Sequence, residues 1–250
     1  MIVTAAMSWW DETPDVLRRA VRASAQIADR IVALDGAYRR FPGGTPASPP
    51  EQAQAICEAA EEVGLDCLVL SPSRLWAGEN EKRTYLYQMA AIGSDWIAVV
   101  DADHIVVCDR ETARATIASR PDVNVWSVDF HTPPNPDRPM ELSAAGPWHA
   151  KSSGIVIPFA HLLRALPDIR CERFHWWHSA LLGTERVWMQ YGGNDYAVPD
   201  GRRVLPHEHL DGYRVDHVTL FKDADRVQIN RSFYDETAKL VKATGQEDDL

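Results

Sequence analysis

The sequence predicts an α/β fold, built on a mostly parallel β-sheet with helices on both faces. The main observation is that short apolar runs and longer amphipathic runs alternate over the first hundred residues. That alternation is typical of parallel sheets joined by crossover helices. The second observation is that capping and turn residues separate these runs. The 250 residues, 45% of them hydrophobic, are enough for one compact domain with a real core.

The first half of the chain supplies four predicted strands and three predicted helices. Apolar runs predict strands at residues 2–7, 30–35, 67–70 and 96–100. Helical spacing predicts helices at residues 13–30, 50–63 and 79–92. Thr13 and Pro14 provide a capping hydroxyl and a proline at the first helical position, and Gly64 and Gly93 follow the second and third helices. Residues 41–50 are rich in Gly, Pro and Ser, which predicts a loop.

The second half of the chain is less regular. Strands are predicted at residues 124–130, 154–157 and 213–220, and helices at residues 159–166 and 231–243. Four prolines within residues 133–139 predict a loop. No internal repeat and no sharp boundary interrupts the chain, so we expect a single domain over residues 1–250.

Composition narrows the class of protein and its compartment. The formal net charge of −10 and the pI of about 5.3 argue against broad electrostatic binding of nucleic acid. The four cysteines form no C-x-x-C pair, which favours reduced and mostly buried thiols. No charged n-region precedes the first apolar run, and no run approaches the roughly 20 apolar residues of a membrane span. We therefore expect a cytoplasmic protein without a membrane span.

Carboxylates stand at the ends of two predicted strands. Asp35 follows the second strand, and Asp101 and Asp103 follow the fourth. Ligands of such sheets bind beyond the carboxyl ends of the strands, where these residues would lie together. Two carboxylates spaced i, i+2 on a turn can converge on one divalent cation such as Mg²⁺ or Mn²⁺. The alternative is an Asx turn that closes the strand, but carboxylates beside a buried strand are costly unless solvated, paired or metal-bound.

Three segments together resemble the GT-A glycosyltransferases. Residues 95–104, Asp-Trp-Ile-Ala-Val-Val-Asp-Ala-Asp-His, resemble the metal-site strand of that superfamily, whose D-x-D motif holds the metal and the donor diphosphate. Residues 81–83, Glu-Lys-Arg, are similar to the basic pair that often precedes this strand. Residues 216–234 resemble the late H…R…R…Y pattern, in which the histidine is a third protein ligand of the metal. The resemblance covers roughly residues 1–110 and 213–235.

The resemblance implies a single-domain GT-A fold, which is Rossmann-like. A donor half of about residues 1–120 would precede an acceptor half of about residues 121–250 that ends in a metal and diphosphate segment. It also implies transfer of a sugar from a nucleoside-diphosphate sugar, with a UDP-sugar favoured, and Mn²⁺ or Mg²⁺ as cofactor. The implied metal ligands are Asp101, Asp103 and His217. The implied nucleotide-sugar-binding residues are Thr4, Ala6, Asp35, Lys82, Arg83, Asp101, Lys222, Arg226 and Arg231.

The acceptor side departs from the family pattern. No residue matches the acidic general base of inverting members, and the candidates for it are Glu185, Asp195 and Glu208. Aromatic faces stack on sugars, so we expect the acceptor platform, or alternatively part of the core, at Trp148, His149, Trp176 and Trp177. The acceptor stays open among a protein side chain, a glycan, a lipid-linked sugar, a small molecule and a modified nucleic-acid base.

Three other functions compete with the glycosyltransferase. A nucleotidyltransferase that makes an NDP-sugar usually has a Gly-rich basic loop after the first strand, and residues 7–12, Met-Ser-Trp-Trp-Asp-Glu, lack one. A non-catalytic domain that binds a nucleotide sugar or a glycan would bind without turnover. A zinc hydrolase could be built on the histidines, but no cysteine or carboxylate completes a tetrahedral set around His175 and His178.

Overall fold

The computed structural model describes residues 1–131, 133, 156–174, 177–182, 185–188, 207–218, 228–229 and 232–233. Its first half contains β1 (Val3–Ser8), α1 (Pro14–Ser24), β2 (Arg30–Leu34), α2 (Pro50–Glu62), β3 (Asp66–Leu70), α3 (Glu79–Ala91), β4 (Trp96–Asp101), β5 (His104–Val107) and α4 (Arg110–Ser119). Its second half contains β6 (Val125–His131), β7 (Val156–Arg164), β8 (Arg170–Phe174), β9 (Trp177–Leu182), β10 (Glu185–Trp188) and β11 (His207–His217).

The main sheet has eight strands in the order β3-β2-β1-β4-β7-β6-β11-β5. Strands β3, β2, β1 and β4 are parallel to one another, and β6 pairs in parallel with β11. Strands β7 and β5 run antiparallel to their neighbours. A separate antiparallel sheet contains β8, β9 and β10. The protein is therefore an α/β domain with a mostly parallel, Rossmann-like sheet, as the sequence predicts.

The sheet is strongly curled, and the curl brings distant strands to the site. Strands β4 and β5 are joined only by Ala102 and Asp103, yet they are fourth and eighth in the sheet. A link this short requires the first residue of the edge strand β5 to lie close to the carboxyl end of β4. Because β11 pairs with β5, its last residue His217 also reaches that end.

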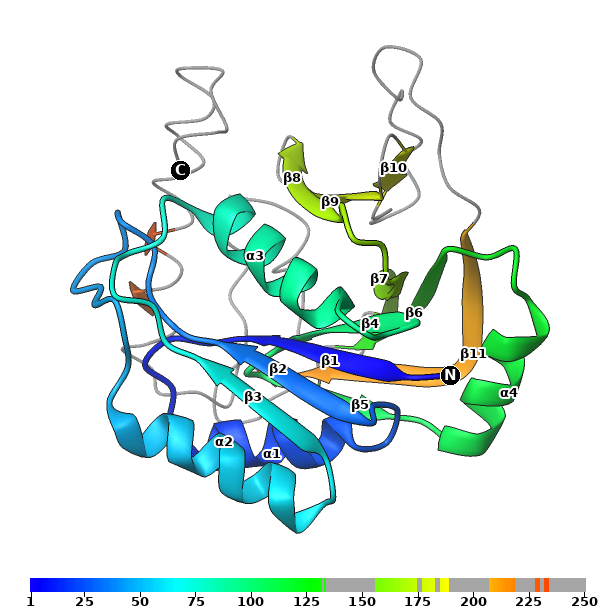
Figure 1. Ribbon diagram of the computed structural model, residues 1–250, viewed down its shortest axis with the longest axis horizontal. Helices are drawn as coiled ribbons and strands as arrows, with labels where there is room; N and C mark the ends of the chain where they lie inside the picture. The colour runs from blue at the N-terminus through cyan, green and yellow to red at the C-terminus, as the bar shows by residue number, and fades with distance from the viewer. Residues whose placement is uncertain are drawn as a thin grey trace.

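Helices cover both faces of the sheet (Figure 1). Helices α1 and α2 pack on one face, with Leu17, Val21 and Ile56 in a core that also includes α4. Helix α3 packs on the other face through Leu86 and Ala90. The alternation of strand side chains between two apolar cores explains why the parallel strands read as continuous apolar runs. None of the helices in the described ranges is both long and apolar enough to cross a membrane.

Local signals account for the starts of α1 and α4. The side chain of Thr13 accepts a hydrogen bond from the Val16 amide at 3.4 Å, and Pro14 occupies the first turn of α1. Asp109 accepts from the Thr112 amide at 2.7 Å and caps α4. The predicted elements up to β4 are confirmed, although α1 ends at Ser24 rather than near residue 30. Strand β5 and helix α4 are additions that the sequence patterns did not predict.

Two predictions for the second half need correction, and a third lies outside the described residues. Residues 159–166 are not a helix, because β7 runs over Val156–Arg164 and pairs with both β4 and β6. Leu162 enters one core and Leu163 the other, so this short apolar run is a strand buried on both faces. Strand β11 begins at His207, six residues before the predicted start. The predicted helix at residues 231–243 lies almost entirely outside the described residues.

The thiols also differ from expectation. Cys171 is buried and Cys108 half-buried, but Cys57 and Cys67 are exposed, with their Sγ atoms 3.9 Å apart. Cys57 lies on α2 and Cys67 on the edge strand β3, where the sheet leaves one side of the strand uncovered. Burial in the core was therefore the wrong expectation for these two residues.

Candidate functional site

The turn between β4 and β5 places two carboxylates at the carboxyl edge of the sheet. Val99 and Val100 of β4 are buried, and the chain leaves the core at Asp101. The Asp101 amide then donates a hydrogen bond to Nδ1 of His104 at 3.1 Å, which closes the turn around Ala102 and Asp103. Asp103 is only 7% exposed, so this carboxylate needs a compensating charge nearby.

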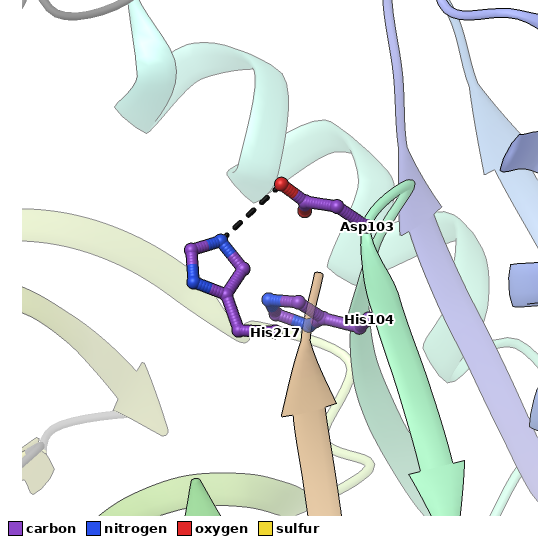
Figure 2. A group of neighbouring side chains, drawn as sticks. All are labelled: Asp103, His104 and His217. Carbon is purple, nitrogen blue, oxygen red and sulfur yellow. Dashed lines mark ion pairs between the residues drawn. The ribbon is translucent and has the colours of Figure 1, made fainter. Parts of the chain in front are cut away.

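The end of β11 brings a histidine to that turn. His217 pairs with His104 across β11 and β5, and the Val218 amide donates to the carbonyl of Asp103 at 2.8 Å. As a result, Nε2 of His217 lies 3.2 Å from Oδ2 of Asp103. Figure 2 shows the His217 ring pointing at the Asp103 carboxylate, with the His104 ring beside both. Each of the three residues has one potential ligand atom within 4.8 Å of the others.

Asp101 faces a buried guanidinium. Both carboxylate oxygens of Asp101 accept hydrogen bonds of 3.0 Å from Arg83, whose Nε donates to Glu79 at 2.7 Å. Burial raises the pKa of Asp101, but the charge and hydrogen bonds of Arg83 outweigh it, so the pKa lies below its usual value. Asp101 therefore carries a negative charge that Arg83 already compensates, whereas Asp103 faces His217.

The buried histidines beneath the turn are neutral. Burial lowers the pKa of His104 to about 4, although Asp101 and Asp103 act in the opposite direction. Burial likewise lowers the pKa of His161 on β7 to about 3. The rings of His104 and Phe130 lie edge to face at 5.3 Å, and Phe130 also packs on His217 at 5.1 Å. Packing against Phe130 thus holds the rings of His104 and His217 beside the Asp101–Asp103 turn.

Lys82 connects the loops that follow β1 and β2. Its side chain is 2% exposed, and Nζ donates hydrogen bonds of 2.7 Å to the carbonyls of Trp9 and Gly36. Asp35 organises the second of these loops, because its carboxylate accepts from the Gly36 amide at 2.6 Å and from the Ser48 amide at 2.7 Å. Both residues were predicted to contact the nucleotide sugar, and in the structure both shape the loops at the carboxyl edge.

We expect Lys82 to make stability depend on pH. Burial lowers the pKa of Lys82 from 10.5 to about 7. Above pH 7 the unfolded chain therefore holds a proton that the folded protein lacks, and stability should rise by about 1.4 kcal/mol per pH unit. A neutral amine keeps two N–H donors for the Trp9 and Gly36 carbonyls.

The measurement is urea unfolding of the wild type and of the Lys82→Met variant from pH 7 to about pH 8.5. Thiols of the unfolded chain begin to ionise in this range, but both proteins have the same cysteines, so this contribution cancels in the difference. The free energy of unfolding of the wild type should rise relative to that of the variant as pH rises, because the methionine variant has no group that titrates at this position. A difference that stays constant over this range would contradict the prediction.

An aromatic cluster borders the same loops. Trp10 and Phe41 meet edge to face at 4.9 Å, and Phe233 packs on Phe41 at 4.8 Å and on Tyr38 at 6.1 Å. Lys82 Nζ lies 5.7 Å from the centre of the Tyr38 ring. Phe233 follows His217 in the sequence, and its ring packs against residues of the loops after β1 and β2. Nothing in the local sequence identifies Phe233 as a partner of Trp10 and Phe41.

Several predicted residues lie away from this edge. Thr4 is buried near the start of β1, where its hydroxyl contacts Ser94 and Arg30, and Ala6 is buried in the core beneath α3. Glu208 lies near the start of β11, at the other end of the strand from His217, and forms an ion pair with Arg120 at 2.5 Å. The structure therefore does not bring these three residues to the Asp103–His217 pair.

Two other predicted residues begin strands of the small antiparallel sheet. Glu185 begins β10 and Trp177 begins β9. The remaining predicted residues, Trp148, His149, Trp176, Asp195, Lys222, Arg226 and Arg231, lie outside the described residues. His104 is the neighbour of the pair that the sequence patterns did not single out. Its position directly after the D-x-D tripeptide, three residues from Asp101, was the available signal.

The comparisons with known proteins find similarity to solved structures only. No protein-family model matches the sequence, and no curated protein matches it. Among solved structures the chain is similar to S. aureus TarS, with a TM-score of 0.38 and 12% identity over 58% of this chain and 24% of that one. It is also similar to TarS 1-349, at a TM-score of 0.36 and 13% identity over 57% of this chain and 39% of that one. The same TarS fragment in complex with UDP gives a TM-score of 0.35 and 12% identity over the same shares.

The matched part spans 24% to 39% of the length of those TarS chains.

Proposed function

We propose that the protein is a metal-dependent glycosyltransferase that takes its sugar from a nucleoside-diphosphate sugar, with a UDP-sugar favoured. The single observation that carries the proposal is the meeting of Asp103 and His217, 3.2 Å apart, at the carboxyl edge of an α/β sheet. The resemblance to GT-A glycosyltransferases predicts that the second aspartate of D-x-D and a late histidine bind the same metal ion. The edge is also where sheets of this class bind their ligands.

The donor set of the pair fits a divalent cation. A carboxylate oxygen and an imidazole nitrogen suit Mn²⁺, and Mg²⁺ accepts the carboxylate more readily than the imidazole. We assign the protein ligands to Asp103 and His217, since Arg83 engages both oxygens of Asp101. When bound, the cation supplies positive charge beside the diphosphate leaving group, where charge builds as the sugar departs.

The residues around the pair hold the loops of the donor half in place. Lys82 joins the loops after β1 and β2 through the Trp9 and Gly36 carbonyls, and Arg83 fixes Asp101 at the end of β4. The half-buried Trp10 lies in the first of these loops, at the edge where a base would stack. These contacts support a donor half of about residues 1–120, and we place the acceptor in the half that follows.

Donor hydrolysis tests the proposal. The protein is incubated with a panel of NDP-sugars in Mn²⁺ or in EDTA, and the released nucleoside diphosphate is measured. We expect release from one donor, a UDP-sugar, and its loss in EDTA, because the diphosphate then lacks its counter-charge.

Calorimetry with the free nucleoside diphosphates, in Mn²⁺ and in EDTA, complements the hydrolysis assay. Binding without hydrolysis would indicate a transferase that awaits its acceptor or a non-catalytic binding domain, and addition of candidate acceptors separates the two. The absence of both hydrolysis and metal-dependent nucleotide binding would refute the proposal.

A further inference from the structure

We propose that His104 is a positioning residue of the cation site and not a cation ligand. It would hold the Asp101–Asp103 turn through Nδ1, while Asp103 and His217 provide the protein ligands. This inference rests on the proposed function, because it concerns the same site. It also separates three side chains that proximity alone would treat as equivalent, since each offers a potential ligand atom within 4.8 Å of the others.

The hydrogen bond to Asp101 determines the tautomer of His104. The Asp101 backbone amide can only donate, so Nδ1 of His104, at 3.1 Å, must accept with its lone pair. An imidazole that accepts at Nδ1 is neutral and carries its proton on Nε2. A protonated nitrogen has no lone pair for a metal. Neither nitrogen of His104 is therefore a ligand atom while this bond persists.

Packing keeps the ring in this orientation. His104 is 3% exposed, and its ring lies edge to face against Phe130 at 5.3 Å and against His217 at 5.6 Å. To ligate a cation, the ring would have to give up the Asp101 amide, which would then be left without this acceptor. Breaking that bond would also release the turn that directs Asp103 toward His217. The packing thus favours a support role for His104.

His217 differs from His104 in both respects. Its Nε2 faces Oδ2 of Asp103 at 3.2 Å, so the two atoms already converge on one point. Its side chain is also more exposed than that of His104, which leaves room for the remaining ligands of a cation. The cluster therefore contains two converging ligand atoms and one ring that supports the turn.

Two amide substitutions distinguish the roles, because asparagine places its oxygen near the position of Nδ1 and glutamine places its amide near Nε2. The affinity for Mn²⁺ alone is measured by electron paramagnetic resonance for wild type, His104→Asn and His104→Gln. We expect His104→Asn to stay within about threefold of wild type and His104→Gln to lose about 10-fold or more, as is typical when a partner that orients a metal site is removed. The reverse order, with glutamine better than asparagine, would overturn the proposal and make His104 a ligand.

The exposed His209 of β11 offers a matched control. The His209→Asn variant should bind Mn²⁺ as wild type does, and thermal unfolding of each variant shows whether it is folded. If neither His104 variant folds, nitrogen NMR of the wild type decides the question.

The imidazole ¹⁵N shifts of the metal-free protein report the tautomer directly. We expect an unprotonated Nδ1 and a protonated Nε2 for His104, unchanged when Mg²⁺ is added. A proton on Nδ1, or loss of the Nε2 proton on metal addition, would overturn the proposal. Failure of the wild type to bind Mn²⁺ would instead overturn the proposed function and with it the cation site, whereas the ¹⁵N shifts would still decide whether His104 holds the turn.

Discussion

Replacing Asp103 by asparagine should lower metal-dependent donor hydrolysis by about 100-fold or more. Loss of a residue that merely orients a metal ligand costs about 10- to 100-fold, and Asp103 is assigned as a ligand itself. Asparagine keeps the size of the side chain and removes the charge that faces His217 at 3.2 Å. The measurement is the initial rate of nucleoside-diphosphate release at saturating donor, over a range of Mn²⁺ concentrations.

Asp66 provides the matched control for this substitution. It is an exposed carboxylate at the start of the edge strand β3, at the amino edge of the sheet. The Asp66→Asn variant should keep the wild-type rate and the wild-type dependence of that rate on Mn²⁺ concentration. Equal rates for Asp103→Asn and the wild type at every Mn²⁺ concentration would remove Asp103 from the cation site.

Replacing Arg83 by methionine should lower the free energy of unfolding by about 3–5 kcal/mol, the usual cost of removing one partner from a buried ion pair. Arg83 lies between Glu79 and Asp101, with hydrogen bonds of 2.7 Å and 3.0 Å. Without the guanidinium, the buried Glu79 carboxylate has no opposite charge from this residue, and the end of β4 is no longer held. Methionine fills a similar volume, so the loss reports charge rather than a cavity.

Urea unfolding measures this loss, with Arg22→Met as the comparison. Arg22 pairs with Glu62 at 2.6 Å, but both side chains are about half exposed. Exposed pairs contribute roughly 0–1 kcal/mol, so this variant should be close to wild type. A loss for Arg83→Met no larger than that for Arg22→Met would show that the buried network does not stabilise the fold.

The first half of the fold could be predicted from sequence because local patterns and tertiary environment agree there. Strands β1, β2, β3 and β4 are apolar runs separated by helices that begin at Pro14 and Pro50 or end before Gly64 and Gly93, and the parallel sheet follows from that order. The pattern fails at β7, where an apolar run suits a helix or a strand equally well. Pairing with β4 and β6 makes it a strand, and these partners cannot be identified from the residues of the run itself.

The candidate site shows the same division. The tripeptide Asp101-Ala102-Asp103 is visible in the sequence at the end of an apolar run, and a late histidine is visible before a basic segment. The sequence does not show that the first carboxylate faces Arg83 and the second faces His217. The i, i+2 spacing does not distinguish the two aspartates. In the structure the partner of Asp101 comes from α3 and the partner of Asp103 comes from β11.

By itself, the sequence determined the alternation of strands and helices, the acidic turn after the fourth strand and the basic pair at the start of α3. These features depend on neighbours along the chain, through side-chain periodicity and capping. Only the tertiary structure decided which carboxylate meets a histidine, that Lys82 joins two loops and that His104 closes the turn. The meeting of Asp103 and His217 depends on the curl of the sheet, because a two-residue link between β4 and β5 brings β11 to the end of β4. Lys82 reaches its two loops because α3 packs against β1 and β2.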